Sequence, residues 1–146
     1  MTAQVIVAVL VGLAAAIEDL ARRRVSNWIP LAALAGGLAW HIAQAGWRGA
    51  LTAAGGAAAG LAIFLVFYLV GGMGGGDVKL MAGFGSLLGA GRLLEAALWT
   101  GAAGGLMALA VLAVGALRSR PVRRGESIPY APAIAVGAWL SLIPKG

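Results

Sequence analysis

The sequence contains no cysteine and only one histidine among its 146 residues. The lack of cysteine excludes disulfide bonds, thiolate zinc sites and cysteine nucleophiles. A single histidine cannot form a multi-histidine metal site within one chain. We therefore expect a protein that works without a metal ion and without a cofactor.

Charged residues are also scarce, at 11% of the chain, whereas 61% of the residues are hydrophobic and the mean hydropathy is +0.93. A soluble domain averages about 25% charged residues, so these charges are too few to cover a surface in water. The 24 glycines follow no collagen-like period. The composition predicts one all-α, polytopic membrane domain whose helices pack closely through small side chains.

Six apolar segments are expected to form a bundle of about six transmembrane helices. They cover residues 2–18, 28–45, 50–70, 78–90, 93–117 and 128–143. The fourth segment is shorter than the about 20 residues that a bilayer crossing needs. It can span only if the glycine-rich stretch 71–76 also lies in the membrane, covered by protein or a water-filled cavity.

The basic residues predict the orientation, because lysine and arginine collect on the cytoplasmic side. If the loop after the first segment is cytoplasmic, that side holds Arg22, Arg23, Arg24, Lys79, Arg118, Arg120, Arg123 and Arg124. The opposite side then holds only Arg48, Arg92 and Lys145. Both termini are expected outside. The net charge of +6 is thus explained by the lipid bilayer, and no nucleic-acid partner is expected.

Glycine pairs spaced by four residues recur at 56/60, 85/89 and 101/105. Such pairs let helix backbones approach closely. We expect all three to serve packing within one chain, with a dimer interface as the alternative; the oligomeric state stays open.

Carboxylates are the most informative residues, because an acid at the edge of a span is costly unless it is paired or hydrated. Asp19 ends the first segment, and Asp77 precedes the fourth. Two crossings separate them, so both should lie at the cytoplasmic edge. Two neighbouring carboxylates tend to share one proton. One can then activate water while the other polarises a carbonyl, which is the chemistry of aspartic peptidases.

Gly74 and Gly76 leave the flank of Asp77 free of side chains, so an extended substrate backbone could approach the acid. Glycine also permits the positive φ angles that a sharp turn into a helix requires. Taken alone, this stretch favours a flexible turn that caps the next helix.

Three separate segments together resemble the type IV prepilin peptidases. Gly-Gly-Met-Gly-Gly-Gly-Asp-Val-Lys-Leu at 71–80 is similar to the family's Gly-x-Gly-Asp motif. Asp19-Leu-Ala-Arg-Arg-Arg-Val-Ser-Asn27 matches the spacing of the other acidic motif, with Val-Ser-Asn in place of Ile-Pro-Asn. Ile-Pro-Tyr-Ala-Pro-Ala at 128–133 is similar to the Pro-Tyr-x-Pro-Ala segment.

This resemblance implies an aspartic endopeptidase of the bacterial inner membrane with Asp19 and Asp77 as the catalytic pair. The substrate would be a prepilin or pseudopilin with a short basic leader followed by a hydrophobic helix, cleaved after the glycine that ends the leader, at the cytoplasmic face. The chain resembles the short form found with tight-adherence (Flp) pili. Residues 1–146 would be a single peptidase domain without the CxxC-containing domain associated with N-methylation.

Several further residues are expected to support the catalytic pair. Glu18 competes with Asp19, but the motif spacing selects Asp19. Asn27 belongs to the first motif, and Lys79 is expected to be an anchor at the membrane interface, with a role beside the acids as the alternative. From the resemblance alone, three residues would shape the start of the last helix: Pro129, Tyr130 and Pro132.

Two rival hypotheses remain at this level. Another Gly-x-Gly-Asp peptidase, of the signal-peptide-peptidase or preflagellin kind, would use similar acids. A small transporter or pilus-assembly scaffold could instead use them to handle protons or ions.

Overall fold

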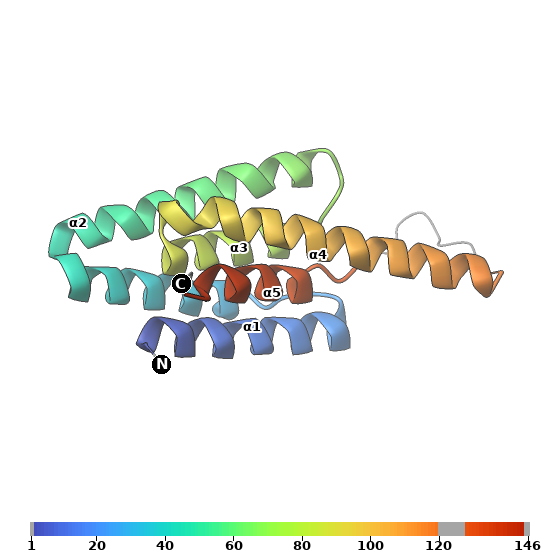
Figure 1. The fold of residues 1–146 in the computed structure, drawn as a ribbon, viewed down its shortest axis with the longest axis horizontal. Coiled ribbons are helices and arrows are strands. Elements are labelled where there is room, and N and C mark those ends of the chain that lie inside the picture. Colours follow the sequence, from blue (N-terminus) through green and yellow to red (C-terminus); the bar gives the residue numbers. More distant parts are fainter. Residues whose placement is uncertain (1, 120–127, 145–146) are drawn as a thin grey trace.

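A computed structural model describes residues 2–119 and 128–144 of the chain. Its helices are α1 (Ala3–Arg22), α2 (Trp28–Leu69), α3 (Gly75–Leu88), α4 (Ala90–Leu117) and α5 (Ala131–Leu142). They lie roughly along one common direction in an elongated bundle (Figure 1). The predicted all-α class is confirmed. Four of the basic residues used to predict the orientation lie outside the described residues: Arg120, Arg123, Arg124 and Lys145.

Helix α2 joins two of the predicted segments, 28–45 and 50–70, across a sharp kink. Ala45 (φ −143°, ψ 17°) and Gly46 (φ 58°, ψ −134°) leave the helical region, and the chain reverses its direction there (Figure 1). The two arms of α2 therefore run antiparallel. The positive φ at Gly46 explains the reversal, because a residue without Cβ adopts it at little cost. Five helices are thus assigned where six were predicted.

Three of the described helices are long and apolar enough to cross a membrane: α1, α2 and α4. Helix α3 has 14 residues and α5 has 12. At 1.5 Å per residue these two measure only about 21 Å and 18 Å, below the about 30 Å of a bilayer core. The protein is a multi-pass membrane protein, but helix length supports three spans and does not show the predicted six.

Helix α3 is the centre of the bundle, with ten of its residues buried. Both arms of α2 pack against it through glycine. A Cβ at Gly56 would overlap the carbonyl oxygen of Gly85, and a Cβ at Gly60 would lie 2.6 Å from the carbonyl oxygen of Met81. On the first arm, a Cβ at Gly37 would overlap the backbone between Ser86 and Leu87.

The expected packing role of the glycine pairs is therefore confirmed for 56/60 and 85/89. It is wrong for Gly101 and Gly105 on α4. A Cβ built at either position meets no atom within 4 Å among the described residues, because both glycines border a cavity instead of a packed helix.

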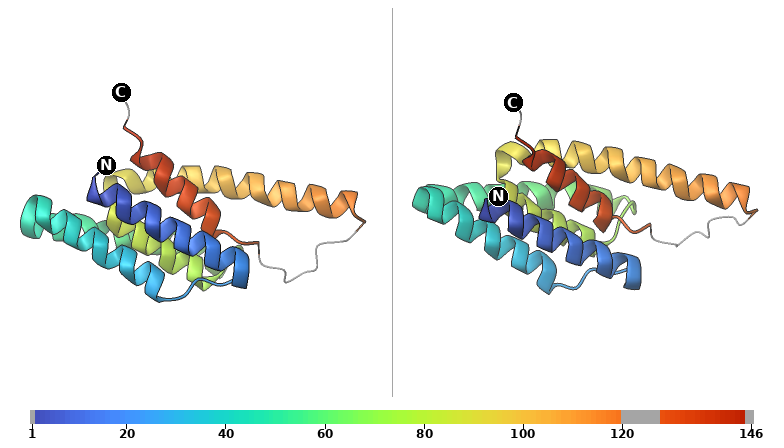
Figure 2. Two further views of the ribbon diagram at one scale, coloured as in Figure 1. Left: turned by 90° about the horizontal axis from the view of Figure 1, so that it is seen from below. Right: turned by 60° about the horizontal axis from the view of Figure 1, so that its bottom comes forward.

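The chain order brings the two aspartates to one end of the bundle. Helix α1 ends, α3 begins and α5 begins at this end, whereas α1 begins and α5 ends at the other (Figures 1 and 2). Helix α5 begins at Ala131 rather than at 128, and Pro132 lies in its first turn, where the missing N–H of proline costs no helical hydrogen bond.

Candidate active site

A polar cavity of about 280 Å³ lies at the end of the bundle where α1 stops and α3 starts. Asp19 and Asp77 both line it, although 58 residues separate them in the chain. Three segments build its walls: the chain that follows α1, the glycine-rich stretch before α3, and Ile128 before α5. The structure thus brings the two predicted acids into one site.

Asp19 lies in the last turn of α1 and is only 6% exposed. The backbone N–H of Ala131, the first residue of α5, donates a hydrogen bond to its Oδ2 at 3.0 Å. This N–H is one of the unpaired donors at a helix start, which carry a partial positive charge. The bond fixes the orientation of the Asp19 carboxyl group.

Asp77 lies in the first turn of α3 and is 8% exposed. Its backbone N–H donates to the carbonyl oxygen of Gly74 at 3.2 Å, which sets the acid at the start of the helix. The carboxyl groups of Asp19 and Asp77 are close enough to interact electrostatically. Two buried carboxylates in such a position favour a state in which they hold one proton between them.

The glycines before Asp77 act through space and not through unusual backbone angles. Gly74 has an extended conformation (φ −81°, ψ 156°), and the positive φ of this region occurs earlier, at Gly71 (φ 83°). A Cβ at Gly74 would lie 3.6 Å from Oδ2 of Asp77, and one at Gly76 would lie 3.6 Å from Cβ of Val25. Side chains there would fill the space beside the acid.

Basic and amide groups surround the rest of the cavity. Arg23, Arg24, Asn27 and Lys79 all line it. Nζ of Lys79 donates a hydrogen bond to Oδ1 of Asn27 at 3.1 Å. Lys79 therefore lies beside the acids and joins the start of α2 to α3, which is the alternative that the sequence had ranked second.

Glu18 is not among the residues that line this cavity, and it binds the chain between α1 and α2. One carboxylate oxygen accepts a hydrogen bond from the backbone N–H of Ser26 at 2.8 Å, and the other accepts one from its hydroxyl at 2.5 Å. Arg22 lies 3.8 Å from the same carboxylate. Glu18 is thus a positioning residue for the 23–27 wall and does not line the site.

The motif before α5 contributes mainly through its backbone. Pro132 occupies the first turn of α5, where its fixed φ suits a helix start. Tyr130 packs against α4, where a Cβ at Gly104 would lie 2.8 Å from its ring. It also lines a second cavity, which is apolar. Pro129 lies in the non-helical segment between Ile128 and Tyr130.

Several groups of the site were missed from the sequence. Arg23 and Arg24 had been assigned to orientation alone, while Val25 and Ile128 had no assigned role. The N–H of Ala131 was missed as well. Its motif was noticed, but a backbone donor leaves no signal in residue types.

The arrangement suits general acid and base chemistry on a peptide bond. The described residues contain no group of three or more His, Cys, Asp and Glu side chains that could hold a metal ion. The cavity contains two buried carboxyl groups next to a stretch of glycine backbone that carries no side chains.

Comparison with known proteins supports this description. The type IV leader peptidase family matches residues 6–109. The chain belongs to this family.

A family relative, the prepilin leader peptidase/N-methyltransferase of Bacillus subtilis (strain 168), is 38% identical over 90 residues. The matched region is 60% of this chain and 34% of the relative, so the chain spans about a third of the length of that protein. No solved structure matches the chain.

Proposed function

We propose that this member of the type IV leader peptidase family is a membrane aspartic endopeptidase that uses Asp19 and Asp77. The observation that carries the proposal is the shared cavity, which is lined by two buried carboxyl groups, one from α1 and one from α3. Burying two ionisable carboxyl groups within a membrane protein costs free energy, and such groups mark functional sites.

In the proposed reaction, one carboxylate takes a proton from a water molecule, which attacks the scissile carbonyl carbon. The other carboxyl group, protonated, donates a hydrogen bond to the carbonyl oxygen as negative charge develops on it. The C–N bond then breaks, and the leaving amine takes up a proton. Gly74 and Gly76 give the substrate backbone room to reach the acids.

The proposed substrate is a prepilin or pseudopilin, cleaved after the glycine that ends its leader. Family membership and the name of the Bacillus relative support this class of substrate. The N-methyltransferase part of that name is not carried over. The sequence has no cysteine, so we assign to residues 1–146 a peptidase domain alone.

We further propose six crossings or half-crossings, formed by α1, the two arms of α2, α3, α4 and α5. The aspartates then lie at the cytoplasmic face of a bacterial inner membrane, and both termini lie outside. Arg22, Arg24 and Lys79 cluster at the aspartate end, in agreement with the positive-inside rule.

The absence of cysteine makes this orientation easy to test. A membrane-impermeant thiol reagent on intact cells should label Arg48→Cys, near the α2 kink, and spare Arg22→Cys. Both variants should be labelled after the cells are opened. Labelling of Arg22→Cys in intact cells would reverse the proposed orientation.

The activity itself is tested with membranes from a host that lacks its own prepilin peptidase. They are incubated with a candidate precursor, and mass spectrometry reads the new N-terminus. We expect a cut after glycine by the unmodified chain and by Glu95→Gln, since Glu95 does not line the cavity. Asp77→Asn should cut about 10²- to 10⁴-fold more slowly. Absence of any cut by folded protein with several precursors would favour the transporter or scaffold hypothesis.

A further inference from the structure

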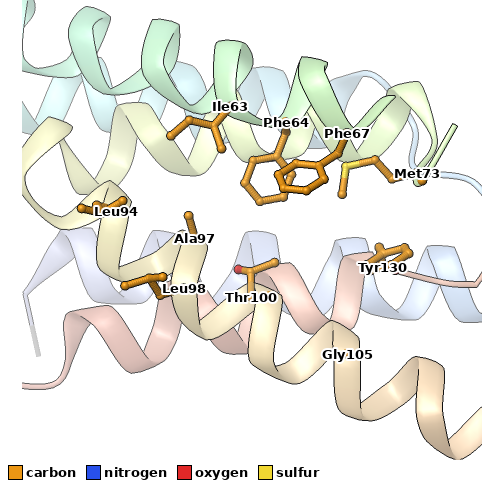
Figure 3. A pocket seen from close by; sticks show the side chains of 12 residues that line it. Ile63, Phe64, Phe67, Met73, Leu94, Ala97, Leu98, Thr100, Gly105 and Tyr130 are labelled. Atoms are coloured by element: carbon orange, nitrogen blue, oxygen red, sulfur yellow. The ribbon is translucent and has the colours of Figure 1, made fainter. Parts of the chain in front are cut away.

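A second cavity, of about 440 Å³, lies between the second arm of α2 and α4 and is almost entirely apolar. Figure 3 shows Phe64 and Phe67 of α2 facing Ala97 and Thr100 of α4, with Tyr130 at one end. Its volume falls within the about 300–1,000 Å³ that is usual for ligand pockets. The proposed peptidase chemistry makes no use of it.

The α4 wall of this cavity is a stripe of small residues. Ala97, Gly101 and Gly105 are spaced by four and therefore share one helix face. A Cβ at Gly101 or Gly105 would meet no described atom within 4 Å, whereas the neighbouring Gly104 is packed against Tyr130. In membranes, such a stripe lets a second helix approach closely. The described part of this chain supplies no helix to fill that place.

The mouth of the cavity is apolar as well. Phe67 is 53% exposed, Leu94 64% and Leu98 69%. These side chains lie on the two helices that form the walls, both of which are candidate membrane spans. An apolar helix lying in the bilayer can therefore reach the cavity without passing a charged group.

Two segments of the chain contribute neighbouring residues to the apolar cavity and to the cavity of the aspartates. In the first, Gly72 and Met73 line the apolar cavity, while Gly74 and Asp77 line the acidic one. In the second, the boundary falls between Tyr130 and Ile128. A polypeptide that leaves the apolar cavity along residues 72–77 arrives directly at the acid pair.

We infer that the apolar cavity is the docking groove for the apolar helix of the substrate, the helix that follows the scissile bond. This inference rests on the proposed peptidase function. The open stripe at Gly101 and Gly105 receives the substrate helix, while the continuous 72–77 segment aligns its first residues with Asp19 and Asp77. The enzyme then selects a precursor by its membrane helix as well as by its leader.

Filling the stripe tests the inference. Gly101→Leu and Gly105→Leu place a side chain in the groove without disturbing the packing of the chain, because both positions face open space. Gly91→Leu is the matched control, since it is also on α4 and open but does not line the cavity. Two substrates are compared: a full precursor and a soluble peptide that spans the cleavage site but lacks the helix.

We expect each groove variant to lower the ratio of kcat/KM for the precursor to kcat/KM for the peptide by about tenfold or more, the scale on which a filled apolar pocket discriminates. The Gly91→Leu ratio should equal that of the unmodified enzyme. Unchanged ratios in both groove variants would overturn the inference while leaving the peptidase proposal intact.

A second measurement does not depend on catalysis. A photoreactive phenylalanine analogue at position 101, in the Asp77→Asn background, should cross-link to the helix of the full precursor, and one at position 91 should not. Cross-links only to a second copy of the chain, or only to lipid, would contradict docking of the substrate helix. If the unmodified enzyme cuts no precursor, the peptidase proposal fails, and the cross-link still decides the groove.

Discussion

The backbone N–H of Ala131 donates a hydrogen bond to Oδ2 of Asp19, across 112 residues of sequence. This bond ties the start of α5 to the end of α1, so the last helix holds one acid while α3 carries the other. The motif at 128–133 is far from the two acidic motifs in the sequence, yet it supplies a hydrogen-bond donor to the same site. This bond explains why a third part of the chain belongs to the site.

Glu18 and Ser26 should act as a unit, because both hydrogen bonds of the Glu18 carboxylate go to Ser26. Glu18→Gln and Ser26→Ala should each reduce cleavage by loosening the 23–27 wall. The double variant should lose no more activity than the more impaired single variant, since the pair shares one role. Cleavage rates of the four proteins measure this coupling. Losses that multiply would show that the two residues act independently.

Gly85→Ala should destabilise the fold, because its Cβ would overlap the carbonyl oxygen of Gly56 and push α3 away from α2. We expect a loss of about 1–3 kcal/mol in the free energy of unfolding, as for other overpacked interiors. Gly55→Ala is the control, since a Cβ there meets no described atom. Thermal unfolding in detergent should show a lower Tm for Gly85→Ala only; equal Tm values would contradict the packing described for α3.

Cleavage should depend on pH in a bell shape. The proposed reaction needs one proton on the pair of Asp19 and Asp77, as a base to activate water and an acid to polarise the carbonyl. Acidic solution protonates both groups and removes the base. Alkaline solution ionises both and removes the acid. The profile of kcat/KM against pH in detergent measures this, and a rate that rises steadily with pH would exclude the shared proton.

Much of the fold could be predicted from the sequence, because apolar runs and basic loops report directly on membrane segments. The prediction of two acids at one edge came from counting crossings between Asp19 and Asp77. The assignment of five helices could not be predicted. It depends on the φ and ψ angles of Ala45 and Gly46, and one glycine among 24 carries no sign that the chain reverses there.

The candidate site was predictable only in its side chains. Sequence patterns point to carboxylates, but they do not reveal which backbone N–H meets them or which wall lies opposite. The placement of Lys79 beside Asn27 also depends on how α2 and α3 pack, which spacing alone does not determine. The same limit explains Gly101 and Gly105, whose spacing matches that of the packed pairs although their face is open.

The central claim is that Asp19 and Asp77 form one catalytic pair. The most direct test measures precursor cleavage by Asp19→Asn, Asp77→Asn and the double variant, with Glu95→Gln as control and the new N-terminus read by mass spectrometry. We predict that both single variants lose about 10²- to 10⁴-fold in rate, the usual worth of general acid and base groups. The double variant should be no slower, because the residues act as a unit. Cleavage at the unmodified rate by either folded single variant would contradict the claim.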